Sequence, residues 1–229
     1  MTKICYNSLM QIDVTRILYH GSKSGIVGPI APISRDVCDF GRGFYLGDSP
    51  TQPMTLICHD ASPKFYVCEL DLSGLGTYVF SDKNQWALYI AYCRGKCRRF
   101  SGTVLYRQLE DLAAGQDVLV GKIANDRMFM VLNDFFDGAI TDKAMVASLE
   151  VLNLGTQYCL KTAKACSRVR IREERSVSVS ECAALRTKSD DQRRRAIELT
   201  EGVYKQYRRD GLFFDEFFEE YATKGLPCS

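Results

Sequence analysis

Two stretches decide how this sequence folds: Leu-Tyr-His-Gly-Ser at residues 18–22 and Asp-Phe-Gly-Arg-Gly-Phe-Tyr-Leu-Gly at residues 39–47. Each is a short apolar run of β-strand character that carries a ring side chain, His20 or Tyr45, close to glycine. Glycine permits positive φ and lets a ligand approach the backbone closely, and a histidine or tyrosine ring there can hold a planar ligand. The two stretches therefore predict two strands at the edge of one pocket.

The segment between these stretches has the composition of a long loop. Residues 22–38 contain two prolines and two glycines, and long loops in compact domains are usually functional or mobile. Arg35 and Asp39 lie at the far end of this loop, next to the second glycine-rich stretch.

Hydrophobic periodicity and turn signals divide the rest of the chain into short elements. Beyond the first two strands we expect further strands at residues 64–72, 117–124, 157–161 and 169–177. We expect helices at residues 83–92, 128–136 and 142–152, and a single helical turn at 49–52 that Pro53 ends. We also expect helices at 178–188 and 192–223, joined by the charged residues 189–191, with a break at Gly211 in the second. Many short strands with few long helices favour an α+β fold over a doubly wound parallel sheet.

The character of the chain changes after residue 177, so we predict a main domain at residues 1–177 and a helical extension at 178–229. Aromatic residues are dense at 204–221. A face of this kind packs on the main domain or meets a partner chain.

Composition places the chain among ordinary soluble globular proteins, with 46% hydrophobic residues, 25% charged residues and a net charge of +2. We find no signal peptide and no apolar run long enough to span a membrane, which predicts a cytoplasmic protein. The ten cysteines form no CxxC pair and lie at no zinc-finger spacing from the two histidines, so we expect reduced thiols and no metal.

Several kinds of chemistry lack their sequence signatures. There is no GxGxxG motif after the first strand and no Walker phosphate loop, and a Cys–His nucleophile pair stays open without a local motif. Four of the six residues at 94–99 are basic, and 193–195 is a run of three arginines. Each run fits either a solvated surface or contact with phosphates.

The strand at 117–124 runs directly into Asn125 and Asp126, which precede a helix. Polar residues at this position suit a ligand site, and they also suit a helix cap. The two interpretations are compatible, and we keep both.

Five motifs together resemble an uncharacterised bacterial family of the ADP-ribosyltransferase superfamily, in its diphtheria-toxin-like branch, over roughly residues 16–175. They are Tyr-His-Gly-Ser (19–22), the loop to Arg35, Asp-Phe-Gly-Arg-Gly-Phe-Tyr (39–45), Gly-Lys-Ile-Ala-Asn-Asp (121–126) and Gln-Tyr-Cys-Leu-Lys-Thr (157–162). The resemblance implies a split mixed β-sheet domain that binds NAD, with a His–Tyr–acid set on three strands.

By position, the resemblance implies that His20 hydrogen-bonds the NAD ribose and that the backbone of Gly21 holds the nicotinamide amide. Tyr45 would stack on the nicotinamide ring, and Arg35 would contact the phosphates. The remaining residues expected to bind NAD are Ser22, Asp39, Phe40, Gly43, Phe44 and Asn125.

The third position of the set is Gln157, where the superfamily has glutamate. Glutamine can hydrogen-bond a ribose hydroxyl, but it cannot offset a developing positive charge or act as a base. Either another acid serves, for which we choose Asp126, or the substrate assists, or the protein binds NAD without turning it over.

The resemblance therefore implies a mono-ADP-ribosyltransferase that uses NAD as substrate, releases nicotinamide and modifies a protein or nucleic-acid acceptor. Toxin and defence effector are roles that fit such an enzyme. The alternatives are an NAD glycohydrolase, a silent module that binds NAD or ADP-ribose, and an interaction protein that acts through its C-terminal helices.

Overall fold

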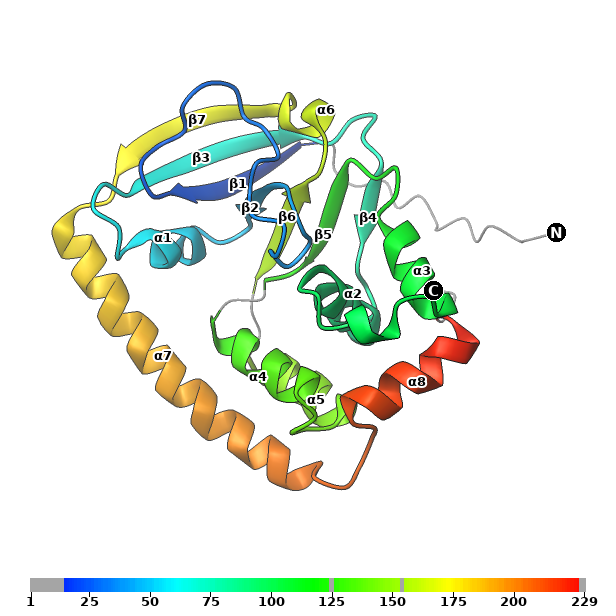
Figure 1. The fold of residues 1–229 in the computed structure, drawn as a ribbon. Helices are drawn as coiled ribbons and strands as arrows, with labels where there is room; N and C mark the ends of the chain where they lie inside the picture. The colour runs from blue at the N-terminus through cyan, green and yellow to red at the C-terminus, as the bar shows by residue number, and fades with distance from the viewer. Residues whose placement is uncertain (1–14, 124–125, 153–154, 227–229) are drawn as a thin grey trace.

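A seven-stranded mixed β-sheet, with most of the helices on one side of it, makes this an α+β protein (Figure 1). The computed structural model describes residues 15–123, 126–152 and 155–226. In sheet order the strands are β4 (Thr77–Val79), β5 (Val118–Lys122), β6 (Thr156–Leu160), β2 (Phe44–Gly47), β1 (Thr15–Ser22), β3 (Lys64–Asp71) and β7 (Val169–Ser176). The helices are α1 (Thr51–Ile57), α2 (Lys83–Cys93), α3 (Val104–Leu112), α4 (Asp126–Phe136), α5 (Asp142–Leu152), α6 (Ala163–Cys166), α7 (Val179–Gln206) and α8 (Phe214–Lys224), with a 3-10 turn at Arg98–Phe100.

The sheet divides between β1 and β2. Within the described residues these two strands pair at a single position, Tyr19 with Gly47, whereas β1 pairs with β3 along its whole length. One half of the sheet is therefore β1, β3 and β7, and the other is β2, β6, β5 and β4 (Figure 1). Because neighbouring strands diverge on either side of one pairing, the split leaves room for side chains of both halves to converge.

The largest hydrophobic cluster packs the helices α2, α4, α5 and α8 against the second half of the sheet. Phe135 of α4 lies edge-on to Phe214 and Phe217 of α8, with ring centroids 5.4 and 5.5 Å apart. Both α8 rings are about 1% exposed, so this C-terminal helix contributes to the same core as the sheet.

Helix α7 runs along one side of the molecule, from the end of β7 to the helices α4 and α5 (Figure 1). Ser178 caps its N-terminus in a capping box with Glu181, and Arg186 donates to the carbonyl of Cys58 at 3.0 and 2.5 Å. Its other end packs on α5, where Ala196 and Thr200 are buried. One helix thus links both halves of the sheet.

The structure confirms the strands expected at 64–72, 157–161 and 169–177 and the helices expected at 83–92 and 142–152, within one or two residues at each end. The single turn expected before Pro53 is wrong, because α1 continues to Ile57. Pro53 is the third residue of α1, where a backbone N–H would have no intrahelical partner, so its missing donor costs little.

The break expected at 189–191 is also wrong, since α7 is continuous over Val179–Gln206. Charged residues on an exposed helix face do not interrupt the backbone. The break expected at Gly211 is confirmed, because this residue lies in the turn between α7 and α8. β4 and α3 had no counterpart in the sequence analysis. Among the described residues, no helix is both long and apolar enough to cross a membrane.

Candidate functional site

A pocket of about 270 Å³ lies where β1 and β2 diverge. It is lined from both halves of the sheet, from α1 and from the loop that precedes β2. Six residues predicted to bind or act on NAD line it: His20, Gly21, Arg35, Asp39, Tyr45 and Gln157. The two that lie furthest apart in the sequence, His20 and Gln157, are separated by 137 positions.

His20 lies on β1, and one of its ring nitrogens is hydrogen-bonded to the protein backbone. Its Nδ1 is 2.8 Å from the backbone oxygen of Tyr45, and because a carbonyl only accepts, Nδ1 carries the proton. Burial lowers the pKa of His20 from its ordinary value of 6.5, although this backbone hydrogen bond opposes the shift. The ring also stacks on Phe44 at 4.3 Å between centroids. His20 is therefore a neutral imidazole whose Nε2 is left as an acceptor.

The hydroxyl of Tyr45 fixes the turn before β2. It donates to the carbonyl of Gly41 at 2.6 Å and accepts from the N–H of Phe40 at 3.0 Å. Burial raises the pKa of this hydroxyl far above its usual range, so it stays protonated and keeps both bonds. The ring of Tyr45 lines the pocket and is thus held rigidly against its wall.

Gln157, at the second position of β6, is held by two acceptors. Its Nε2 donates to Oδ2 of Asp39 at 3.0 Å and to the carbonyl of Lys122 at 3.0 Å. The other oxygen of Asp39, Oδ1, pairs with the guanidinium of Arg94, which follows the last residue of α2. Both N–H groups of the amide are therefore used, and Oε1 is the group that Gln157 has left to offer a ligand.

Glycine stands opposite Gln157 on both neighbouring strands. Gly47 of β2 and Gly121 of β5 are its register partners. A Cβ at Gly121 would lie 2.8 Å from Phe40 and 2.9 Å from Trp86, so only glycine lets these rings pack against β5. Because neither neighbouring strand carries a side chain opposite Gln157, Asp39 has room to reach the Gln157 amide over this face of the sheet.

The glycine of the Tyr-His-Gly motif has a packing role that the sequence analysis did not anticipate. A Cβ at Gly21 would lie 2.6 Å from the carbonyl oxygen of Pro53 and 3.1 Å from Ile57. Helix α1 thus rests directly on the backbone of β1, which brings Gln52, Pro53 and Leu56 into the pocket wall.

Arg35 is exposed at the pocket and makes no ion pair within the described residues. The charge of Asp39 is offset by Arg94, and His20 is neutral, so Arg35 gives this pocket a net positive character. Such a charge suits an anionic ligand group.

The other predicted residues lie elsewhere. Ser22 closes a turn with Gly25, and Phe40 and Phe44 are buried in the core on either side of the sheet. A Cβ at Gly43 would lie 2.3 Å from Sγ of Cys159, so this glycine serves the close packing of β2 on β6. Asn125 lies outside the described residues, and so does the side chain of Asp126, whose backbone begins α4.

Arg94 is the pocket residue that sequence reasoning missed. It belongs to the basic run at 94–99, and nothing in the sequence signals that it pairs with an acid 55 positions away. Gln52 and Ile123 were likewise not foreseen. Among the described residues no group of three or more metal-ligating side chains is arranged to hold a metal ion, and the described cysteines are free thiols.

Comparisons with curated proteins and with solved structures found no match. A family model does match, described as "Protein of unknown function (DUF3990)", over residues 16–171. The matched region begins in β1 and ends in β7, so it contains every described residue that lines the pocket at the split of the sheet. Since the match spans well over half of the chain, the protein belongs to this family of unknown function.

Proposed function

We propose that this protein is a mono-ADP-ribosyltransferase that uses NAD as its substrate. The observation that carries the proposal is the convergence of His20, Gly21, Tyr45 and Gln157 on one pocket at the split of the sheet. These are the residues to which the resemblance assigns ribose, nicotinamide and the reacting centre, and they come from three different strands.

The chemistry is substitution at the ribose carbon that bears nicotinamide. The bond from C1′ to the nicotinamide nitrogen breaks, and nicotinamide leaves with the bonding electrons. An oxygen or nitrogen of the acceptor forms the new bond to C1′ and loses its proton. Holding NAD with this carbon exposed to the acceptor lowers the barrier by positioning.

Four side chains of the pocket have roles that fit this substrate. The rigid Tyr45 ring offers a face for nicotinamide, and Nε2 of His20 offers an acceptor to a ribose hydroxyl. Oε1 of Gln157 offers a second acceptor. The pocket is near the lower limit of small-molecule sites, so it suits the nicotinamide and its ribose, with the pyrophosphate toward exposed Arg35.

A second candidate is a silent module that binds NAD or ADP-ribose without turnover. Asp39 is the one acid among the described residues that line the pocket, and both of its oxygens are engaged, by Arg94 and by Gln157. A neutral amide with a paired carboxylate stabilises a cationic transition state poorly. This arrangement favours binding over catalysis unless Asp126 or the substrate supplies the charge.

The test is incubation of the purified protein with NAD carrying a label on its adenylate part, with and without cell lysate. Transfer of label to macromolecules together with nicotinamide release is the expected result, and His20→Ala and Tyr45→Ala should abolish both. His59→Ala is the matched control, because His59 is exposed and lies outside the pocket. Nicotinamide release without transfer would make the protein a glycohydrolase, and calorimetric binding without release would make it a silent module.

A further inference from the structure

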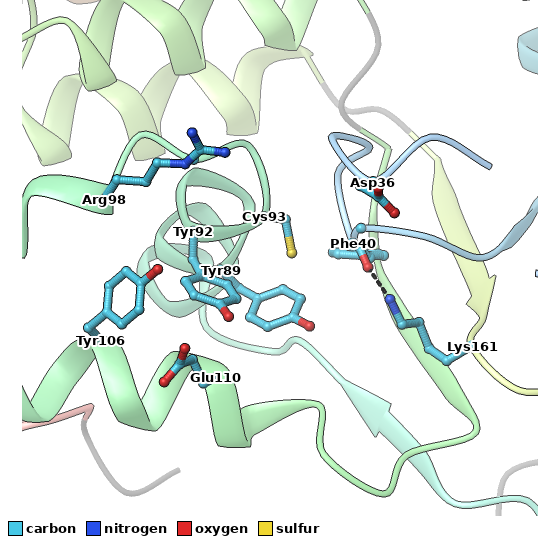
Figure 2. Close-up of a pocket in the computed structure, with 11 residues that line it drawn as sticks. Asp36, Phe40, Tyr89, Tyr92, Cys93, Arg98, Tyr106, Glu110 and Lys161 are labelled. Atoms are coloured by element: carbon cyan, nitrogen blue, oxygen red, sulfur yellow. Dashed lines mark hydrogen bonds between the residues drawn. The ribbon is translucent and has the colours of Figure 1, made fainter. Parts of the chain in front are cut away.

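A second pocket, of about 370 Å³, shares the segment at 35–41 with the first one (its lining residues are drawn in Figure 2). Asp36, Phe40 and Gly41 line it, whereas Arg35, Cys38 and Asp39 of the same segment line the pocket at the split of the sheet. The opposite wall comes from α2 and α3, which take no part in the first pocket except through Arg94 at the end of α2. The segment at 35–41 thus separates two cavities.

Three tyrosines form the helical wall. Tyr89 and Tyr92 project from α2 and Tyr106 from α3 (Figure 2). The ring of Tyr106 meets Tyr92 edge-on, at 5.2 Å between centroids and 76°, and Tyr89 lies 6.1 Å from Tyr92. Tyr92 and Tyr106 are only half-buried, so part of each ring is available to a ligand. Flat aromatic surfaces of this kind bind planar rings by stacking.

Arg98 stands out among the basic residues at 94–99. Arg94 pairs with Asp39, Lys96 with Asp137 and Arg99 with Asp215. Arg98 lines the second pocket, and its guanidinium makes no hydrogen bond or ion pair with any described residue, whereas its backbone bonds Gly95 and Ser101.

The backbone that places Arg98 depends on one glycine. Gly95 follows α2 with φ of 75°, and its N–H bonds the carbonyl of Tyr92, which turns the chain back across the end of the helix. A Cβ at Gly95 would lie 3.0 Å from Nε of Arg98, so the guanidinium lies directly over this turn. The turn therefore holds the Arg98 guanidinium over the end of α2, in the wall of the cavity that the three tyrosines also line.

Both cationic and anionic side chains line this cavity, so it offers hydrogen-bond donors and acceptors. Glu110 of α3 lines the cavity and makes no ion pair among the described residues. Burial raises the pKa of the Tyr92 hydroxyl to about 12, and the nearby carboxylate of Glu110 contributes to this shift. On the far side Lys161 donates to the carbonyl of Phe40 at 2.6 Å and keeps two further N–H groups (Figure 2). The two cations, Arg98 and Lys161, disfavour a ligand that carries only positive charge. The unpaired carboxylate of Glu110 disfavours a ligand that carries only negative charge.

We propose that this second pocket binds a nucleobase. A planar heterocycle stacks on the tyrosine rings, presents ring nitrogens or carbonyl oxygens to Arg98, and donates its N–H groups to Glu110. Unpaired bases are recognised in this way, by stacking on aromatic rings with hydrogen bonds to their edges. The site does not depend on whether the first pocket binds NAD.

The base can come from a free nucleotide or from a single-stranded nucleic acid, and the experiment separates the two. The full chain is titrated by calorimetry with the four ribonucleoside 5′-monophosphates and, by fluorescence anisotropy, with labelled eight-residue single strands of RNA and DNA. Saturable binding of at least one mononucleotide is expected. Tighter binding of an oligonucleotide than of its best mononucleotide identifies nucleic acid as the source, and equal binding identifies the free nucleotide.

Three substitutions tie the binding to the pocket. Tyr106→Ala removes a stacking face and Arg98→Ala removes the unpaired donor, and each should weaken binding by at least about fivefold. Arg209→Ala is the charge-matched control, because Arg209 is exposed and is not among the residues that line the pocket, and it should leave mononucleotide binding unchanged. Thermal unfolding of each variant shows whether it remains folded.

Tyr106→Phe covers the case in which the alanine variant does not fold. It retains the ring and should retain most of the affinity. The proposal is overturned if no nucleotide or oligonucleotide binds saturably, or if folded Arg98→Ala binds as the unaltered protein does. It is also overturned if NAD displaces the nucleotide competitively and Arg98→Ala weakens NAD equally, because the cavity would then be part of the dinucleotide site. Nicotinamide release is measured separately, so a failure here is distinct from a failure of the proposed NAD chemistry.

Discussion

Oδ2 of Asp39 accepts a hydrogen bond from Nε2 of Gln157 at 3.0 Å, across 118 positions of the chain. The same carboxylate pairs through Oδ1 with Arg94. An amide at position 157 is therefore matched to its surroundings, because it donates to a carboxylate and to the carbonyl of Lys122 at once. Glutamate, which has no N–H, could make neither bond.

Gln157→Glu should consequently destabilise the fold, in spite of restoring the residue type found in the superfamily. It places a second carboxylate beside Asp39 and leaves the Lys122 carbonyl without its donor, which should lower the free energy of unfolding by about 1–3 kcal/mol. Urea denaturation at pH 7 measures this loss. The swap Asp39→Asn with Gln157→Glu keeps one amide and one carboxylate and should recover part of the stability. If Gln157→Glu alone is as stable as the unaltered protein, the role given to Asp39 is contradicted.

Tyr45→Phe separates the ring of this residue from its hydroxyl. The ring stays in the pocket wall, but the N–H of Phe40 and the carbonyl of Gly41 lose their partner. Leaving these partly buried groups unpaired should cost about 1–3 kcal/mol of stability, measured by urea denaturation. Tyr19→Phe is the control, since the Tyr19 hydroxyl makes no hydrogen bond among the described residues, and it should change stability by less than about 0.5 kcal/mol.

The sequence was sufficient for the elements whose pattern is local. The strand at 64–72 and the helix that begins at residue 83 were both predicted, because adjacent residues encode them; Asp82 caps that helix by accepting from the N–H of Gln85 at 2.7 Å. The pairing of Arg94 with Asp39 depends on how α2 is placed against the loop before β2, and no local signal encodes it. The same holds for Gly21, whose glycine is required by α1 rather than by a turn. Local patterns thus gave the strands of the pocket, and tertiary contacts decided which side chains complete it.

The buried His20 makes stability depend on pH in a defined direction. Burial lowers the pKa of His20 in the folded protein below 6.5, so the unfolded chain binds the proton first as the solution is acidified. Stability should therefore fall as the pH drops below about 6.5 and level off below the folded pKa. Denaturation curves between pH 5 and 7.5 should show this slope, reduced in His20→Gln. An equal slope in both proteins would assign the effect to other groups.

Gly21→Ala tests whether α1 rests on the backbone of β1. The added Cβ would meet the carbonyl oxygen of Pro53 at 2.6 Å, and overpacking of this kind costs about 1–3 kcal/mol. Gly202→Ala is the matched control: it lies within α7 with nothing within 4 Å of the added Cβ, and it should stabilise the protein by about 0.5–1 kcal/mol. Opposite signs in thermal unfolding would support the arrangement, and a neutral Gly21→Ala would refute it.

The aromatic C-terminal segment gives the last prediction. Phe217 is 1% exposed and packs edge-on against Phe135, whereas Phe213, four residues earlier, is 39% exposed. If α8 is part of the core, Phe217→Ala should lower the free energy of unfolding by about 3–5 kcal/mol, while Phe213→Ala should change it by less than about 1 kcal/mol. For the same reason, deletion of residues 178–229 should yield insoluble protein, because it uncovers Phe135 and the rings around it. A truncated chain that stays soluble and folded would instead mark these helices as a separate unit that serves a partner.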